Sequence, residues 1–151
     1  MISRKLLLLA TVALFCMIFI GSTQTAPLNK RQAVVYVDFE DEITGQWTWT
    51  SDGFDFVKRA DGDFYRFRGL FTRGFEKDTN IQNYEFFVIT KDRQKIDYTQ
   101  DIIENVKISS AGGTSPFQKV YEGFKVSDFV GGTFFVKHKG KKFSEATIKL
   151  P

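Results

Sequence analysis

The chain has 151 residues, of which 42% are hydrophobic and 26% charged, a balance that excludes intrinsic disorder and favours a single folded domain. Aromatic residues make up 16% of the chain, with 17 phenylalanines, and such residues are enriched in β-strands. The single cysteine, Cys16, excludes a framework of disulfide bonds.

The N-terminus has the pattern of a secretory signal peptide over residues 1–25. Arg4 and Lys5 precede an apolar run at residues 6–20, and small polar residues follow it. The run is shorter than the roughly 20 residues that a membrane-spanning helix needs. We therefore expect a secreted, extracellular protein that is not an integral membrane protein.

A short leader follows at residues 26–32, and its pair Lys30-Arg31 is either a processing site or part of a soluble N-terminal segment. Residues 1–31 hold four of the 21 basic residues and none of the 18 acidic ones, so the remainder has a net charge of −1. A domain with that balance is not expected to bind nucleic acid. It is also free of cysteine, because Cys16 lies in the signal peptide.

The remaining residues, 33–151, are predicted to form one all-β domain. Residues 33–39 read as a strand with alternate side chains on one face, namely Val35, Val37 and Phe39. An aromatic segment follows at residues 45–75. Two Asp-Gly pairs interrupt it and favour hairpin turns, with Phe54 and Phe56 on a short strand between them.

Four aromatic side chains in this segment are candidates for ligand binding: Trp47, Trp49, Tyr65 and Phe67. The two tryptophans share one face of a predicted strand, with threonines on the other face. Tyr65 and Phe67 alternate with Arg66 and Arg68, which predicts arginines that point outward. The four aromatic residues could form an exposed platform that stacks on sugar rings, line a cavity, or fill the core.

The C-terminal half predicts further strands. Residues 83–90 have apolar side chains on both faces, which is typical of a central strand covered on both sides. Residues 99–108 fit a short helix capped by Thr99 or a strand, and residues 109–116 read as a loop. Strands are expected at residues 117–126, 129–137 and 143–150, with a turn at Lys139-Gly140.

Seven to nine short strands with frequent turns predict an antiparallel β-sandwich, with a closed, calycin-like β-barrel as the alternative. The segment Gly45-Gln46-Trp47 resembles the G-x-W motif of the lipocalins. That resemblance implies an eight-stranded barrel that carries a small hydrophobic molecule. The chain lacks the family's Thr-Asp-Tyr turn, and its residues 146–150 are strand-like where lipocalins have a C-terminal helix, so we do not assign it to the family.

Enzyme signatures are largely missing from the sequence, and we expect no catalytic residues. No nucleophile-elbow, zinc-protease or phosphate-loop motif occurs, and paired carboxylates such as Asp61 and Asp63 have no second feature beside them. His138 is the only histidine, has no carboxylate near it in the sequence, and reads as a surface residue.

Two groups of charged side chains remain as candidate sites. A calcium site could draw on the carboxylates of Asp38, Glu40, Asp41, Glu42, Asp52, Asp55, Asp61 and Asp63, although turn chemistry explains several of these, and we assign no metal site or cofactor. A basic hairpin could bind an anionic partner through Lys137, His138, Lys139, Lys141 and Lys142. The same lysines could instead protect an edge strand from aggregation.

From these patterns we expect a secreted, non-enzymatic binding domain that recognises a glycan or a protein partner on its surface. The alternative is an extracellular carrier that holds a small hydrophobic ligand in a barrel.

Overall fold

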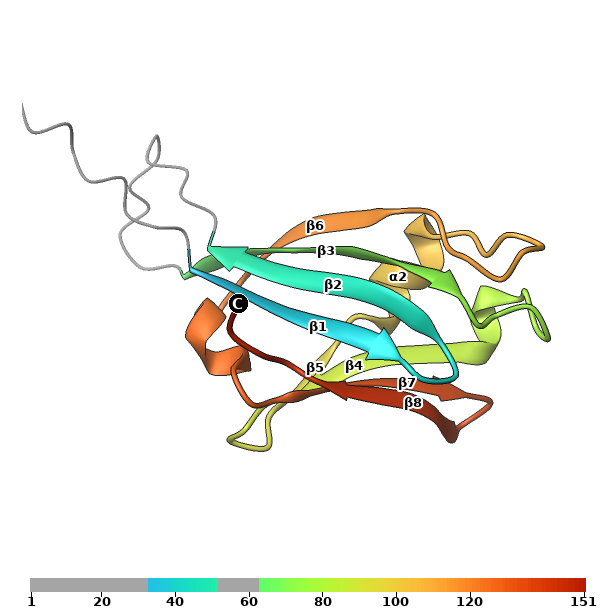
Figure 1. Ribbon diagram of the computed structural model, residues 1–151. Coiled ribbons are helices and arrows are strands. Elements are labelled where there is room, and N and C mark those ends of the chain that lie inside the picture. Colours follow the sequence, from blue (N-terminus) through green and yellow to red (C-terminus); the bar gives the residue numbers. More distant parts are fainter. Residues whose placement is uncertain (1–32, 52–62) are drawn as a thin grey trace, which may run out of the picture. The chain divides into compact units, whose positions relative to one another are not determined.

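Two antiparallel sheets of four strands each make up the fold of the computed structural model, which describes residues 33–51 and 63–151 (Figure 1). The first sheet has the strand order β1 (Val34–Glu40), β2 (Thr44–Ser51), β3 (Phe64–Arg73) and β6 (Phe117–Glu122). The second has the order β5 (Lys95–Asp97), β4 (Tyr84–Ile89), β7 (Thr133–His138) and β8 (Lys141–Thr147). The helices within residues 33–51 and 63–151 are short, namely η1 (Ile81–Asn83), α2 (Thr99–Asn105) and η2 (Val126–Phe129).

The core lies between the inward faces of the two sheets. The predicted alternation is confirmed in β1, where Val35, Val37 and Phe39 are buried. It is also confirmed in β2 and β3, where Trp47, Trp49, Tyr65 and Phe67 are buried while the intervening threonines and arginines are not. The Phe134 ring of β7 meets rings of the first sheet, with centroid distances of 5.4 Å to Phe39 and 5.9 Å to Trp49. This two-layer arrangement is consistent with a β-sandwich.

The strands do not close into a barrel, so the calycin-like alternative is wrong for the described residues. On one side, Tyr36 of β1 exchanges two backbone hydrogen bonds with Lys149, which follows β8, at 2.9 and 2.8 Å. On the other side, β5 has only three residues, and the chain turns directly into α2 instead of pairing with β6. The Asp101 carboxylate of α2 bonds to Lys119 and Tyr121 of β6, so a helix occupies the position where a barrel would need strand pairing.

The helical alternative for residues 99–108 is the one observed, over Thr99–Asn105, but Thr99 does not cap the helix. Its hydroxyl instead accepts the backbone N–H of Phe86 at 2.9 Å and so ties α2 to β4. The predicted strands at residues 117–126 and 129–137 are both partly wrong, because β6 ends at Glu122, Val126–Phe129 form the short helix η2, and β7 begins only at Thr133. Between these elements, Gly131 has a φ of +76°, a backbone conformation that a strand does not adopt.

The outward face of β4 is covered differently from the prediction. Phe87 points away from the core, yet it is only 6% exposed. It stacks on Phe135 with a centroid distance of 5.3 Å, and the ammonium groups of Lys95 and Lys137 lie 4.5 and 5.2 Å from its ring centre. Lysine side chains and one aromatic neighbour, rather than another layer of the fold, therefore shield the apolar outer face of the central strand.

Several sequence predictions fall outside the described residues and stay predictions. They are the signal peptide at residues 1–25, the leader at residues 26–32 with its dibasic pair, and the short strand and two Asp-Gly turns within residues 52–62. Within residues 33–51 and 63–151, no helix is long and apolar enough to cross a membrane.

The two buried tryptophans differ in the partners of their indole N–H groups. Trp49 Nε1 donates to the Tyr98 hydroxyl at 3.1 Å, and Tyr98 shares a second hydrogen bond of 3.0 Å with Tyr65. Trp47 Nε1 is fully buried and has no hydrogen-bond partner among the described residues. The hydrogen bond of Trp49 therefore stabilises the fold, whereas the unpaired N–H of Trp47 lowers stability because it is buried without a partner.

We expect Trp49→Phe to lower the free energy of unfolding by roughly 1–3 kcal/mol more than Trp47→Phe does. Both changes remove similar ring volume, but the first breaks a buried hydrogen bond while the second removes an unpaired donor. Chemical denaturation of both variants measures the difference. Equal losses, or a larger loss for Trp47→Phe, would contradict this assignment, and unchanged denaturant slopes would show that the unfolded states are comparable.

Candidate functional site

The four aromatic residues predicted to bind a ligand all lie in the core. Trp47, Trp49 and Phe67 have no exposed surface, and Tyr65 is 1% exposed. Phe67 stacks between the two tryptophans at centroid distances of 4.9 and 4.8 Å. The prediction of an exposed stacking platform made of these residues is therefore wrong, because their large apolar rings are the main material of a core that has no disulfide bonds.

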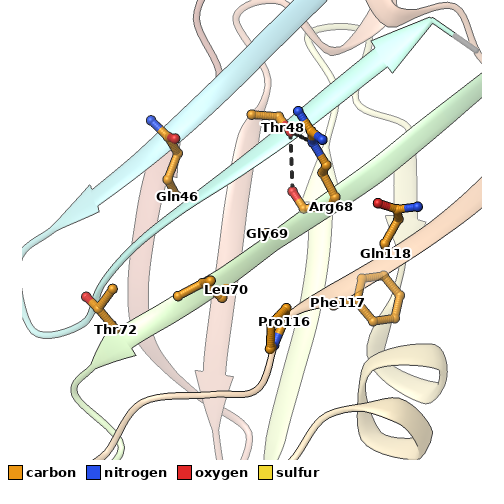
Figure 2. A pocket seen from close by; sticks show the side chains of 9 residues that line it. All are labelled: Gln46, Thr48, Arg68, Gly69, Leu70, Thr72, Pro116, Phe117 and Gln118. Carbon is orange, nitrogen blue, oxygen red and sulfur yellow. Dashed lines mark hydrogen bonds between the residues drawn. The ribbon is translucent and has the colours of Figure 1, made fainter.

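The opposite face of the same strands carries a candidate site. A hollow of about 580 Å³ lies on the outer face of the first sheet, and we call it the outer-face hollow (Figure 2). Its lining comes from β2, β3, β6 and the residue before β6, and consists of Gln46, Thr48, Arg68, Gly69, Leu70, Thr72, Pro116, Phe117 and Gln118. Apart from Phe117, which is buried, and the backbone of Gly69, these are outward-facing or loop residues of mostly polar character.

Strand register arranges the polar side chains in rows across the sheet. Thr48 of β2, Arg68 of β3 and Gln118 of β6 are directly paired, and Tyr36 of β1 extends the row on the far side of Thr48. Adjacent strands are about 4.8 Å apart, so the row spans roughly 14 Å. An extended ligand that lies across the strands would meet a regular series of hydrogen-bonding groups.

Neighbouring side chains hold several of these groups in place. Arg68 Nε donates to the Thr48 hydroxyl at 3.3 Å, as Figure 2 shows, and Gln46 Nε2 donates to the Asp38 carboxylate at 2.8 Å. The hydroxyls of Thr44 and Thr72 are 2.7 Å apart. Side chains that are already oriented lose less conformational entropy when a ligand binds.

The floor of the hollow depends on Gly69. A Cβ atom at this position would lie 2.5 Å from the Trp47 ring, which packs against the β3 backbone from the core side. The glycine therefore allows the tryptophan to pack directly beneath the hollow, while Leu70 and Pro116 supply apolar surface on the outside. The site thus combines a rigid, partly apolar floor with amide, hydroxyl and guanidinium groups around it.

His138 is not the isolated surface residue that the sequence suggested. Its side chain is 30% exposed, its Nε2 lies 2.8 Å from the Asp78 carboxylate, and its ring stacks on Tyr84 at 4.6 Å. Asp78 also accepts hydrogen bonds from the side chain of Asn83 and the backbone of Asn80. These bonds hold the pKa of the Asp78 carboxyl well below its ordinary value of 3.8, with the bond to His138 as the largest cause.

Some of the basic side chains of the predicted hairpin form ion pairs with carboxylates of the protein itself. The Lys139 ammonium lies 3.2 Å from Asp78, and that of Lys142 lies 3.1 Å from Glu145. Lys137 covers Phe87, as described above, and Lys141 is exposed. Binding of an anionic partner by this hairpin stays a prediction.

The carboxylates considered for calcium do not gather in the described residues. No group of three or more His, Cys, Asp or Glu side chains is positioned to hold a metal ion within residues 33–51 and 63–151. Asp38 is engaged by Gln46, and Asp63 faces Lys125 at 3.9 Å. Asp52, Asp55 and Asp61 lie outside the described residues.

Comparison with known proteins finds no matching family model, no similar curated protein and no similar solved structure.

We expect stability to fall as the pH drops below about 4, partly because of Asp78. Its folded-state pKa lies below the ordinary 3.8, so the unfolded chain binds a proton in that range while the folded one resists it. Asp78→Asn should be less stable than the wild type at neutral pH, and the gap should begin to narrow as the pH falls below about 4. Melting temperatures from pH 7 down to pH 3 test this, and parallel curves for the two proteins would contradict it.

Proposed function

We propose that the protein is a secreted, non-enzymatic binding domain that recognises a glycan in the outer-face hollow. The observation that carries this proposal is the row of oriented polar side chains above a rigid, partly apolar floor. Sugars present hydroxyl groups at their edges and C–H groups on their ring faces. The amides, hydroxyls and guanidinium of the hollow can form hydrogen bonds with the sugar hydroxyls, and Leu70 and Pro116 can pack against the C–H groups.

Charge and shape support a glycan that carries an acidic group. Arg68 is exposed at the middle of the row, and its planar guanidinium can bind a carboxylate or sulfate through two hydrogen bonds. None of the residues that line the hollow has a carboxylate to oppose such a ligand. The row is also long enough for a short oligosaccharide lying across the strands.

A protein partner is less well supported by the surface of the domain. Protein interfaces usually centre on exposed aromatic or other large apolar side chains. In the part of the chain that the structure describes, the exposed large hydrophobic residues are Val120 and Leu150, and neither lines the hollow. A concave surface that combines apolar area with hydrogen-bonding side chains suits a polyhydroxyl ligand better.

Two further observations bear on the alternatives. The lining of the outer-face hollow contains no imidazole, carboxyl or thiol group that could act as a general acid, general base or thiol nucleophile, which supports a binding role. Rings from both sheets lie in contact in the core, with Trp47 and Phe134 centroids 5.7 Å apart, and this packing does not favour a carrier of a hydrophobic ligand.

The test is a screen of neutral, carboxylated and sulfated oligosaccharides, followed by titration of the best ligand. We expect binding of an acidic glycan, and Arg68→Ala should weaken it by about tenfold or more because a charge-assisted hydrogen bond is lost. Gln118→Ala should weaken binding less. Arg68 is exposed and its Nε bond is to an exposed threonine, so the fold should tolerate the change.

The control is Lys141→Gln in the β7–β8 hairpin, which should bind as the wild type does. A loss of binding in this control with no effect of Arg68→Ala would move the site to the basic hairpin. Failure of every glycan class to bind would overturn the proposal. If a protein partner then bound the wild type but not Arg68→Ala, the hollow would be a protein-binding site.

A further inference from the structure

A second hollow, of about 360 Å³, shares no lining residue with the first. It lies among the β1–β2 connection, the segment after β3, and the β7–β8 hairpin, which Figure 1 shows at one end of the sheets. We call it the loop hollow. It is lined by Glu42, Gly74, Glu76, Lys77, Tyr84, His138 and Phe143.

Three rings form the walls of the loop hollow. Tyr84 is buried and lies 4.6 Å from His138 and 5.8 Å from Phe143, measured between centroids, while the latter two are 5.9 Å apart. The hydroxyl of Tyr84 donates to the backbone oxygen of Asp78 at 2.8 Å, and Asp78 also holds His138. The rings are therefore fixed, and His138 and Phe143 remain partly exposed at the hollow.

Two glutamates, Glu42 and Glu76, line the same hollow, and glycines lie beside both of them. The Glu76 side chain accepts the backbone N–H of Gly74 at 3.1 Å and packs against Gly112, where a Cβ atom would lie 2.3 Å from the carboxyl carbon. Gly74 has a φ of +114°, and a Cβ there would lie 2.6 Å from the carbonyl oxygen of Glu42. Gly74 thus lets the backbone of Glu42 approach the segment after β3, and Gly112 lets the Glu76 side chain pack against the backbone of the loop that contains Gly112.

Glu76 offers a negative charge to a cation in the hollow, and Arg73 and Lys77 are the positive groups near it. Hydrogen bonds from its own backbone N–H and that of Gly74 lower the pKa of the Glu76 carboxyl, so it is ionised at neutral pH. Lys139 is paired with Asp78, which leaves Lys77 as the lysine that lines the hollow. Lys77 is exposed on a flexible stem and can turn away from an incoming ligand.

We propose that the loop hollow is a binding site for a small organic ammonium group, bound by the aromatic rings and by the carboxylates of Glu42 and Glu76. A cation is attracted to the π-electrons of the rings, and alkyl substituents on its nitrogen pack against their apolar surface. Anionic ligands would meet two carboxylates, and a neutral ligand would gain nothing from them. An alkylated ammonium satisfies both features of the lining.

The first experiment uses the wild-type protein and two matched probes, choline and its uncharged isostere 3,3-dimethyl-1-butanol, in calorimetric titration at fixed ionic strength. We expect saturable binding of choline, with the isostere at least roughly fivefold weaker because it lacks the charge. Absence of saturable choline binding at millimolar concentrations, or equal affinity for the isostere, would overturn the proposal.

Variants then locate the site. Glu76→Gln keeps an oxygen for the Gly74 N–H but loses the charge, and should weaken choline binding by about two- to fivefold. Phe143→Leu keeps apolar volume but loses the ring, and should weaken it by roughly two- to tenfold. Lys77→Gln should tighten binding. If none of the three variants alters the affinity, choline binds elsewhere and the assignment fails.

The choline-binding result does not depend on whether the glycan proposal is correct. Arg68→Ala should leave choline binding unchanged, and Glu76→Gln should leave glycan binding unchanged, so either site can fail alone. An ammonium group can come from a free amine or from a lipid headgroup. Sedimentation with phosphatidylcholine vesicles that free choline reverses would identify the headgroup as the source, and choline binding without vesicle binding would identify a free ligand.

Discussion

The ring of Phe67 is the contact on which the rest of the core depends. It stacks on both tryptophans of β2 and on Tyr98, at a centroid distance of 4.2 Å from the latter, and meets Phe134 of the second sheet at 5.8 Å. One side chain thus joins two strands of its own sheet, the segment before α2 and the facing sheet. In a domain whose described residues include no cysteine, burial of such rings has to supply the stability that disulfide bonds give to some other small domains.

This demand divides each strand of the first sheet into two faces with separate roles. The inward residues are committed to packing, and even a single extra carbon at Gly69 would collide with Trp47. The outward residues carry no such constraint and are free to vary in chemistry. The aromatic core packs against the inner side of the same backbone. Outward side chains such as Arg68 and Gln46 are therefore held in defined positions by the strand and by their hydrogen bonds.

Period-two alternation predicted which residues share a face in β1, β2 and β3, but it left open whether the aromatic face fills the core or binds a ligand. The sequence therefore directed attention to Trp47, whereas the candidate site lies at outward-facing Arg68 on the paired strand. Contacts between distant residues were also beyond reach: Asp78 is 60 positions from His138. For Phe87, an apolar residue on each face suggested two covering layers, because sequence patterns do not reveal that lysine stems can shield a ring.

The pairing of Tyr36 with Lys149 has a mechanical consequence. These residues lie near opposite ends of the described chain and bond in antiparallel register, so the two chain segments leave the pair on the same side of the sheet. A force that pulls residues 33 and 151 apart would load these hydrogen bonds one after another, as in opening a zipper, instead of sharing the load across a strand. Tension along the chain would break the Tyr36–Lys149 pair first. The packing of aromatic rings between the two sheets would then resist further separation.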